Sequence, residues 1–100
     1  MTKNIDKSIK DVKDYCGSIA RGLKNSEINI LKSADNKNIM VLIYPERNQY
    51  MDIELDLLDG LLYDMDVTIR DHVNLEVRYT NECNVKTIEG YELVDTINKI

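Results

Sequence analysis

A stripe of apolar side chains near the N-terminus constrains the fold more than any other feature of the chain. Its members recur at spacings of 4, 3, 4, 3 and 4, and they are Ile5, Ile9, Val12, Cys16, Ile19 and Leu23. This period places all six on one face of an α-helix. We expect a helix that begins after Thr2 or Asn4 and ends at Gly22, although Gly17 leaves an earlier end open. A helix with one apolar face must pack on a sheet or on a second copy of the chain.

The next two segments predict a β-hairpin. Glu27 to Lys32 places Ile28 and Ile30 on one side, and Ile39 to Tyr44 is a nearly continuous apolar run that stops at the only proline, Pro45. A run that is apolar on both faces is typical of a central strand. The polar residues 33–38 between the two segments supply the turn.

Residues 48–70 fit two different structures. As a helix, they repeat the 4, 3, 4, 3 spacing through Met51, Leu55, Leu58, Leu62 and Met65. As a hairpin, two runs of apolar residues alternate with polar ones on either side of a turn at Leu58–Gly60. The abundance of Leu and Met favours the helix, because strands prefer β-branched residues. The hairpin stays open as the alternative.

Beyond Asp66 the pattern predicts extended structure and then a helix. Val67 and Ile69 alternate with polar residues, as do Leu75, Val77 and Tyr79 after a turn near His72. Residues 85–88 suggest one more short strand. The spacing of Tyr91, Val94 and Ile97 suits a short terminal helix. We therefore predict one α+β domain over residues 1–100. Its expected parts are an N-terminal helix, an antiparallel sheet of 4–5 strands, a middle helix or an extra hairpin at 50–70, and a C-terminal helix.

Composition is that of an ordinary globular protein with an aliphatic core. The chain is 43% hydrophobic and 31% charged, and it contains no Phe or Trp. Cys16 and Cys83 stand too far apart for a paired zinc motif, so we expect two buried reduced thiols, with a long-range disulfide as the alternative. The sequence shows neither a charged leader nor an apolar run of the roughly 20 residues that a membrane span needs. These features predict a cytoplasmic protein that does not enter membranes.

Charge is distributed unevenly along the chain. Residues 1–24 carry six bases and three acids, a net charge of +3. Because the whole chain has a net charge of −5, residues 25–100 carry −8. One stretch holds acids without a base among them: Asp52, Glu54, Asp56, Asp59, Asp64 and Asp66. We interpret the first five as an acidic surface for a basic protein partner. A second interpretation is that these acids only keep the domain in solution.

The basic N-terminal segment suggests an alternative function. Its cations flank the apolar stripe, and they are Lys3, Lys7, Lys10, Lys13, Arg21 and Lys24. In a dimer, two such helices could lay a basic strip along nucleic-acid phosphates. The acidic remainder of the chain would repel the same phosphates, so a protein partner is favoured over nucleic acid.

No pattern in the sequence calls for catalysis, a metal or a cofactor. His72 is the single histidine, and metalloprotease, phosphate-loop and hydrolase motifs are absent. An acidic face could hold a divalent cation only if Asp52, Asp56 and Asp59 converged on it. We therefore predict a noncatalytic binding module. The small acidic chain, rich in Asn, Ile and Lys, suits an inhibitor or adaptor from a phage or mobile element of a low-GC bacterium, acting as a homodimer.

Two resemblances to known families complete this reading. The segment Gly17-Ser18-Ile19-Ala20-Arg21-Gly22 resembles the GS-x-ARG element of minimal nucleotidyltransferases. Asn29 stands where that family has a metal-binding acid, which removes the metal chemistry that the resemblance would imply. The expected order of elements also resembles roadblock-type dimerisation modules and acidic secretion chaperones. This second resemblance implies a sheet edge and an apolar helix face that are available for pairing.

Overall fold

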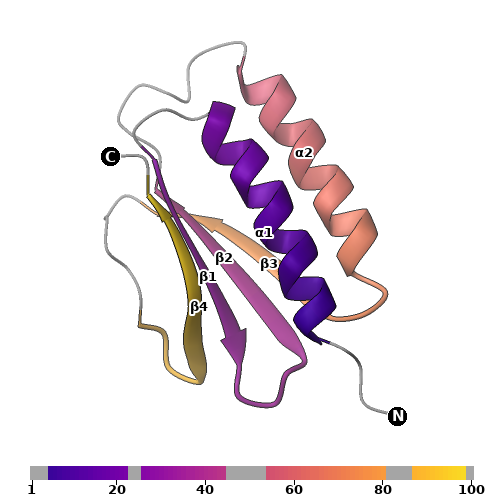
Figure 1. Ribbon diagram of the computed structural model, residues 1–100, viewed down its shortest axis with the longest axis vertical. Helices are drawn as coiled ribbons and strands as arrows, with labels where there is room; N and C mark the ends of the chain where they lie inside the picture. The colour runs from indigo at the N-terminus through magenta and orange to yellow at the C-terminus, as the bar shows by residue number, and fades with distance from the viewer. Residues whose placement is uncertain (1–4, 23–25, 45–53, 81–86, 99–100) are drawn as a thin grey trace.

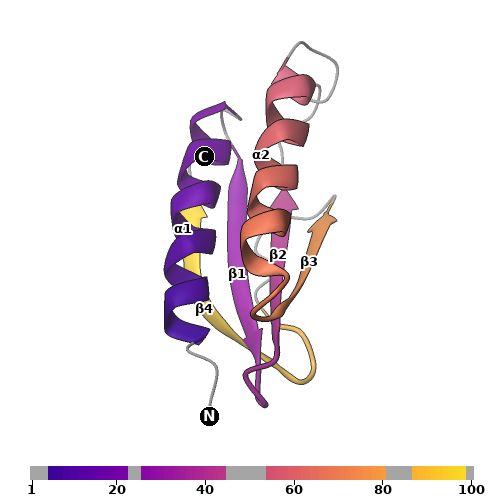
Figure 2. The ribbon, with the colours of Figure 1, turned by 90° about the vertical axis from the view of Figure 1, so that its right-hand side faces the viewer.

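The protein is an α+β structure of two layers, a four-stranded sheet and a pair of helices that covers one face of it (Figure 1; Figure 2). A computed structural model describes residues 5–22, 26–44, 54–80 and 87–98. The elements in chain order are α1 (Ile5–Gly22), β1 (Glu27–Ser33), β2 (Asn38–Tyr44), α2 (Glu54–Ile69), β3 (Asn74–Tyr79) and β4 (Tyr91–Asn98).

The sheet is mixed, and its strand order is β3-β2-β1-β4. β1 pairs antiparallel with both β2 and β4, whereas β2 and β3 run parallel. The parallel pair arises because α2 carries the chain back along the sheet between β2 and β3, which is the connection that parallel neighbours need. The predicted β1–β2 hairpin is therefore confirmed, and the prediction of a purely antiparallel sheet is wrong.

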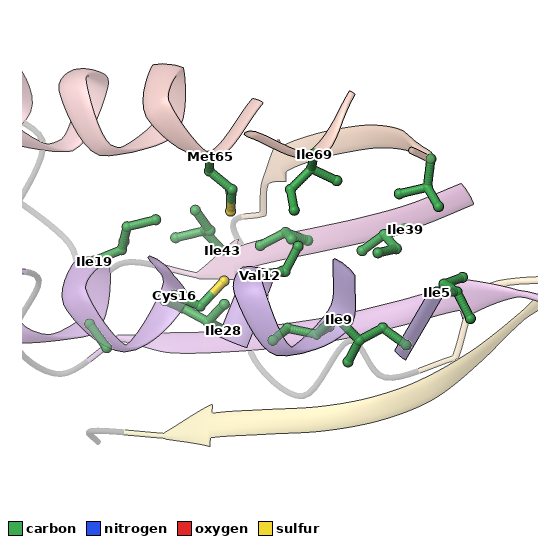
Figure 3. Packing of buried hydrophobic residues seen from close by; sticks show 14 residues of the cluster. Ile5, Ile9, Val12, Cys16, Ile19, Ile28, Ile39, Ile43, Met65 and Ile69 are labelled. Atoms are coloured by element: carbon green, nitrogen blue, oxygen red, sulfur yellow. The ribbon is translucent and has the colours of Figure 1, made fainter. Parts of the chain in front are cut away.

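The apolar stripe of α1 lies against the sheet as its spacing predicts. Ile5, Ile9, Val12, Cys16 and Ile19 are all buried, and Figure 3 shows them directed at the side chains of β1, β2 and α2. The helix continues through Gly17 to Gly22, so the earlier end is wrong. Leu23 lies outside the described residues.

The two central strands are buried on both faces. Toward the helices they present Ile28, Ile30, Ile39, Val41 and Ile43, which join the main core. On the opposite face Leu31, Met40 and Leu42 form a second cluster, covered in part by Ile88 and Tyr91. This double burial explains why the segment that became β2 is apolar almost without interruption.

A polar group is also buried on the face of the sheet opposite the helices. Asn29 of β1 is buried, and the Thr96 hydroxyl of β4 lies 2.7 Å from its side-chain oxygen. The hydroxyl donates this hydrogen bond, which joins β1 to β4 in addition to the backbone ladder. A buried amide oxygen needs such a partner, because burial without one costs free energy.

Residues 54–69 are helical, which confirms the favoured interpretation of this segment over the hairpin for the described part. Met65 and Ile69 are fully buried against α1 and the sheet, and Leu61 and Leu62 are packed against the same core. The prediction of extended structure from Asp66 onward is wrong up to Ile69, because the helix continues to that residue. The predicted strand at Leu75 to Tyr79 is confirmed as β3.

The predicted C-terminal helix is wrong, because Tyr91–Asn98 forms the edge strand β4. A register shift opposite Ile30 and Leu31 marks a bulge in this strand. The extra residue brings Val94 and Ile97 to the same side of the sheet, where both pack on the main core. Their spacing of three therefore imitates helical periodicity. The suggested strand at 85–88 lies partly outside the described residues, and Ile88 belongs to no strand.

The turn between β1 and β2 is held by side-chain hydrogen bonds. The Ser33 hydroxyl donates to the Asp35 carboxylate over 2.6 Å, and the Lys37 backbone N–H donates to the same oxygen over 3.0 Å. These two donors lower the pKa of Asp35, because they stabilise its charged form. Asn36, at the tip, has a φ of 60°, a left-handed conformation that few residues adopt without strain.

Substitution of Asn36 tests this conformation. Asn36→Gly should leave the free energy of unfolding within about 0.5 kcal/mol of the wild-type value or raise it, whereas Asn36→Ala should lower it by about 1 kcal/mol. Urea unfolding followed by circular dichroism measures both values. An Asn36→Ala protein more stable than Asn36→Gly would contradict the observed turn.

Candidate protein-interaction surface

The outward side of α2 is the described surface on which apolar side chains and unpaired acids lie together. Tyr63 is 68% exposed and Val67 is 38% exposed, and they stand one helical turn apart. Asp59 lies one turn before Tyr63, and Asp64 lies three residues before Val67; both acids are exposed. We call Asp59, Tyr63, Asp64 and Val67 the α2 outer face.

The helix acquires this face because its core side is already occupied. Leu61, Leu62, Met65 and Ile69 point toward the core. The exposed side chains of the described part of the helix are Asp59, Tyr63, Asp64, Val67 and Thr68, on its other side. One of these positions is tied to the neighbouring helix, since the Thr68 and Tyr15 hydroxyls lie 3.2 Å apart in a hydrogen bond. This bond joins α2 to α1 in addition to the packing of Met65 and Ile69 on the core.

The acids of α2 differ in their electrostatic environment. The Asp66 carboxylate lies 3.9 Å from the guanidinium of Arg70, the residue that directly follows the helix. Within the described part of the chain, neither Asp59 nor Asp64 forms an ion pair. α2 has no base in its last turn, where the negative end of the helix dipole would favour one. The outer face therefore projects uncompensated negative charge.

The acidic surface predicted from the sequence is only partly visible. Asp59 and Asp64 are exposed on the α2 outer face. Asp52 lies outside the described residues, and Glu54 and Asp56 belong to α2 with side chains outside the described set.

Sequence reasoning missed Tyr63 and Val67 as members of this surface. The alternation of Val67 with its polar neighbours predicts a strand residue instead of an exposed helical one. Tyr63 does not fit the apolar stripe of the predicted helix, and this misfit was the available signal. A large aromatic residue on the polar side of an amphipathic helix is directed away from the core.

The basic residues of the alternative function are scattered among acids. Lys7, Lys10 and Arg21 are exposed on α1, and the Lys13 amine lies 3.6 Å from the Asp95 carboxylate of β4. Lys3 and Lys24 lie outside the described residues. Over Ile5–Gly22 the four bases are opposed by three acids, which gives a net charge of +1. This part of α1 therefore offers phosphates a mixed surface.

The segment that resembles nucleotidyltransferases is a regular part of α1. The Arg21 guanidinium donates to the Ser18 hydroxyl over 2.8 Å, and that hydroxyl donates to the Asp14 carbonyl over 3.4 Å. Gly17 lies in the same continuous helix, and a Cβ there would approach nothing closer than 4.0 Å. A glycine that leaves this space unused does not form the close backbone cradle that phosphate loops need.

The other side chains that could act in catalysis or bind a metal do not gather at one place within the described residues. His72 is exposed in the turn after α2. In the described ranges, no three His, Cys, Asp or Glu residues stand close enough together to hold a metal ion. Neither described helix is both long and apolar enough to cross a membrane.

Comparison with known proteins adds no relative, since no protein-family model, no curated protein and no solved structure matches the chain.

Cys16 is a free thiol on the core-facing side of α1, and it is completely buried. Desolvation raises its pKa from an ordinary value of 9.0 to about 12, because the thiolate would have to exist inside the apolar core. A thiol held neutral in this way is a poor nucleophile and a poor metal ligand. Cys16 is thus a core residue, as expected; Cys83 lies outside the described residues.

The raised pKa makes stability fall with pH in alkali. The folded state keeps the proton that the unfolded state loses, so the contribution of Cys16 is full below pH 9 and is lost between pH 9 and 12. In a Cys83→Ser background, the free energy of unfolding should fall by up to about 1.4 kcal/mol per pH unit relative to a Cys16→Ala variant. Urea titrations at several pH values measure this difference, and parallel pH profiles would refute the burial of the thiol.

Proposed function

We propose that the protein is a noncatalytic binding module whose α2 outer face docks on a basic region of another protein. The observation that carries this proposal is the exposure of Tyr63 and Val67 between two exposed aspartates that form no ion pair within the described residues. The module would act as an inhibitor or adaptor, in which binding itself is the function.

Tyr63 supports this proposal by its side-chain chemistry. Tyrosine is enriched among the residues that dominate binding energy, because it buries a large ring at a small cost in conformational entropy. Leaving such a ring exposed gains little for folding. Val67, one turn along, extends the apolar centre of the surface, so a partner could cover both side chains in one shallow contact.

The flanking acids support a basic partner. Around the helix, Asp59 and Asp64 lie on the two sides of the apolar centre formed by Tyr63 and Val67, and a partner with Lys or Arg at matching positions would pair with them at the rim. Such rim charges accelerate association and select against acidic partners more than they add affinity. The net charge of −5 acts in the same direction at longer range.

Charge reversal on the α2 outer face tests the proposal. The double variant Asp59→Lys/Asp64→Lys should lose the basic partners that the wild-type protein retains, and Tyr63→Ala should weaken their retention by about tenfold or more. Quantitative mass spectrometry after affinity capture from the source organism measures retention.

A matched control makes this experiment specific. Asp71→Lys/Glu89→Lys changes the net charge by the same amount at two exposed positions outside α2, and it should retain the same proteins as the wild type. Circular dichroism establishes that all variants are folded. If Asp59→Lys/Asp64→Lys and Tyr63→Ala retain the full wild-type set, the α2 outer face is not the binding surface.

A further inference from the structure

We propose that two copies of the chain pair antiparallel along the outer edge of β3, in a register centred on Val77, and so join their sheets into one. This inference concerns the sheet edge and goes beyond the binding role of α2, on which it does not depend.

β3 is a sheet edge with a regular ladder. It is the last strand in the order β3-β2-β1-β4, and Figure 2 shows it at the margin of the sheet beyond β2. No described strand pairs with its outer side, and its pairing with β2 runs without a register shift. The opposite edge, β4, contains the bulge near Val94, and bulges hinder the addition of a further strand. Of the two edges, β3 is therefore the better template.

The backbone of β3 fixes which residues can bond to a new strand. The Asn74 N–H donates to the Lys37 carbonyl over 2.9 Å, and the Thr80 N–H donates to the Ile43 carbonyl over 2.8 Å. Backbone N–H and C=O groups alternate in direction along a strand. Those of the even-numbered residues therefore point toward β2, and those of Leu75 and Val77 point outward, away from the sheet. Val77 can therefore exchange two hydrogen bonds with Val77 of a second copy.

Charge selects this register over its neighbours. Glu76 and Arg78 stand opposite Met40 and Leu42 of β2, so they lie on the sheet face away from the helices, where they form an ion pair and remain about half exposed. In a pairing centred on Val77, Glu76 of each copy faces Arg78 of the other. Two adjacent registers also let the outward backbone groups of both strands bond, and they are centred on Glu76 or on Arg78. The first places Glu76 directly opposite Glu76 of the second copy, and the other places Arg78 opposite Arg78, which is unfavourable.

The other face of the same register matches apolar side chains. Val77 would face Val77 of the second copy, and Leu75 would face Tyr79, which is 43% exposed on the single chain. Both faces of one six-residue strand are thus self-complementary under a twofold axis, as a symmetric dimer requires. Two paired six-residue strands bury less surface than a stable protein–protein interface does, so we expect weak association, with a dissociation constant on the order of 100 µM.

Sedimentation equilibrium on the full chain, from about 10 µM to about 1 mM, tests the proposal with charge-swap variants. Arg78→Glu and Glu76→Arg should each weaken dimerisation by about tenfold or more, because each places like charges across the axis. The double variant Glu76→Arg/Arg78→Glu should restore it, and an equimolar mixture of the two single variants should form a heterodimer. Glu89→Arg, an exposed charge away from this edge, should leave the dissociation constant unchanged.

Three results would overturn the proposal. They are a wild-type chain that remains monomeric at about 1 mM, single variants that dimerise as well as the wild type, and a folded double variant that stays monomeric. Loss of partner capture by the α2 variants has no bearing on these measurements, so the two proposals fail separately.

Discussion

Burial of β1 and β2 on both faces is the constraint on which the rest of the structure depends. On one face, Ile28, Ile30 and Val41 are buried beneath helices α1 and α2. On the other face, Leu31 and Met40 are buried with Ile88 and Tyr91 packed against them. At about 25 cal/mol per Å² of apolar surface, each of these fully buried aliphatic side chains of β1 and β2 contributes about 1.5–3 kcal/mol of transfer free energy. Every other element is placed by what it must cover or extend: α1 by its stripe, α2 by Met65 and Ile69, and β4 by its ladder with β1.

The sequence predicted those elements whose local period agrees with their tertiary role. The α1 stripe, the α2 helix and the β3 strand are found because each buries one face that repeats at the spacing of its own element, and the β1–β2 hairpin is found because β2 is apolar on both faces, as a central strand is. Prediction failed where tertiary pairing changes the period. The bulge in β4 brings Val94 and Ile97 to one side, so an edge strand imitates a helix. At the end of α2, the alternation of Val67 and Ile69 imitates a strand, since only Ile69 reaches the core while Val67 faces solvent.

The candidate site was predictable in its charge and not in its apolar centre. Asp59 and Asp64 are exposed, as a run of acids without bases indicates, whereas Tyr63 and Val67 could be placed beside them only after α2 had been positioned against α1. The same logic applies to β3. Glu76 and Arg78 are an ordinary charged pair in the sequence, and their value for self-association follows only from the edge position of the strand and from the direction of its backbone groups. In this molecule the buried hairpin determines the fold, and the surfaces that it leaves uncovered determine the candidate functions.

Native-state hydrogen exchange tests the central role of the hairpin most directly. The backbone amides of Ile28 and Ile30 in β1, and of Val41 in β2, should exchange only through global unfolding, with an opening free energy equal to that from urea unfolding. Amides of the edge strands β3 and β4 should open at lower free energy, because each is paired on one side within the described sheet. Slowest exchange in β4 or α2, with the β1 and β2 amides exchanging through cheaper local openings, would contradict the account.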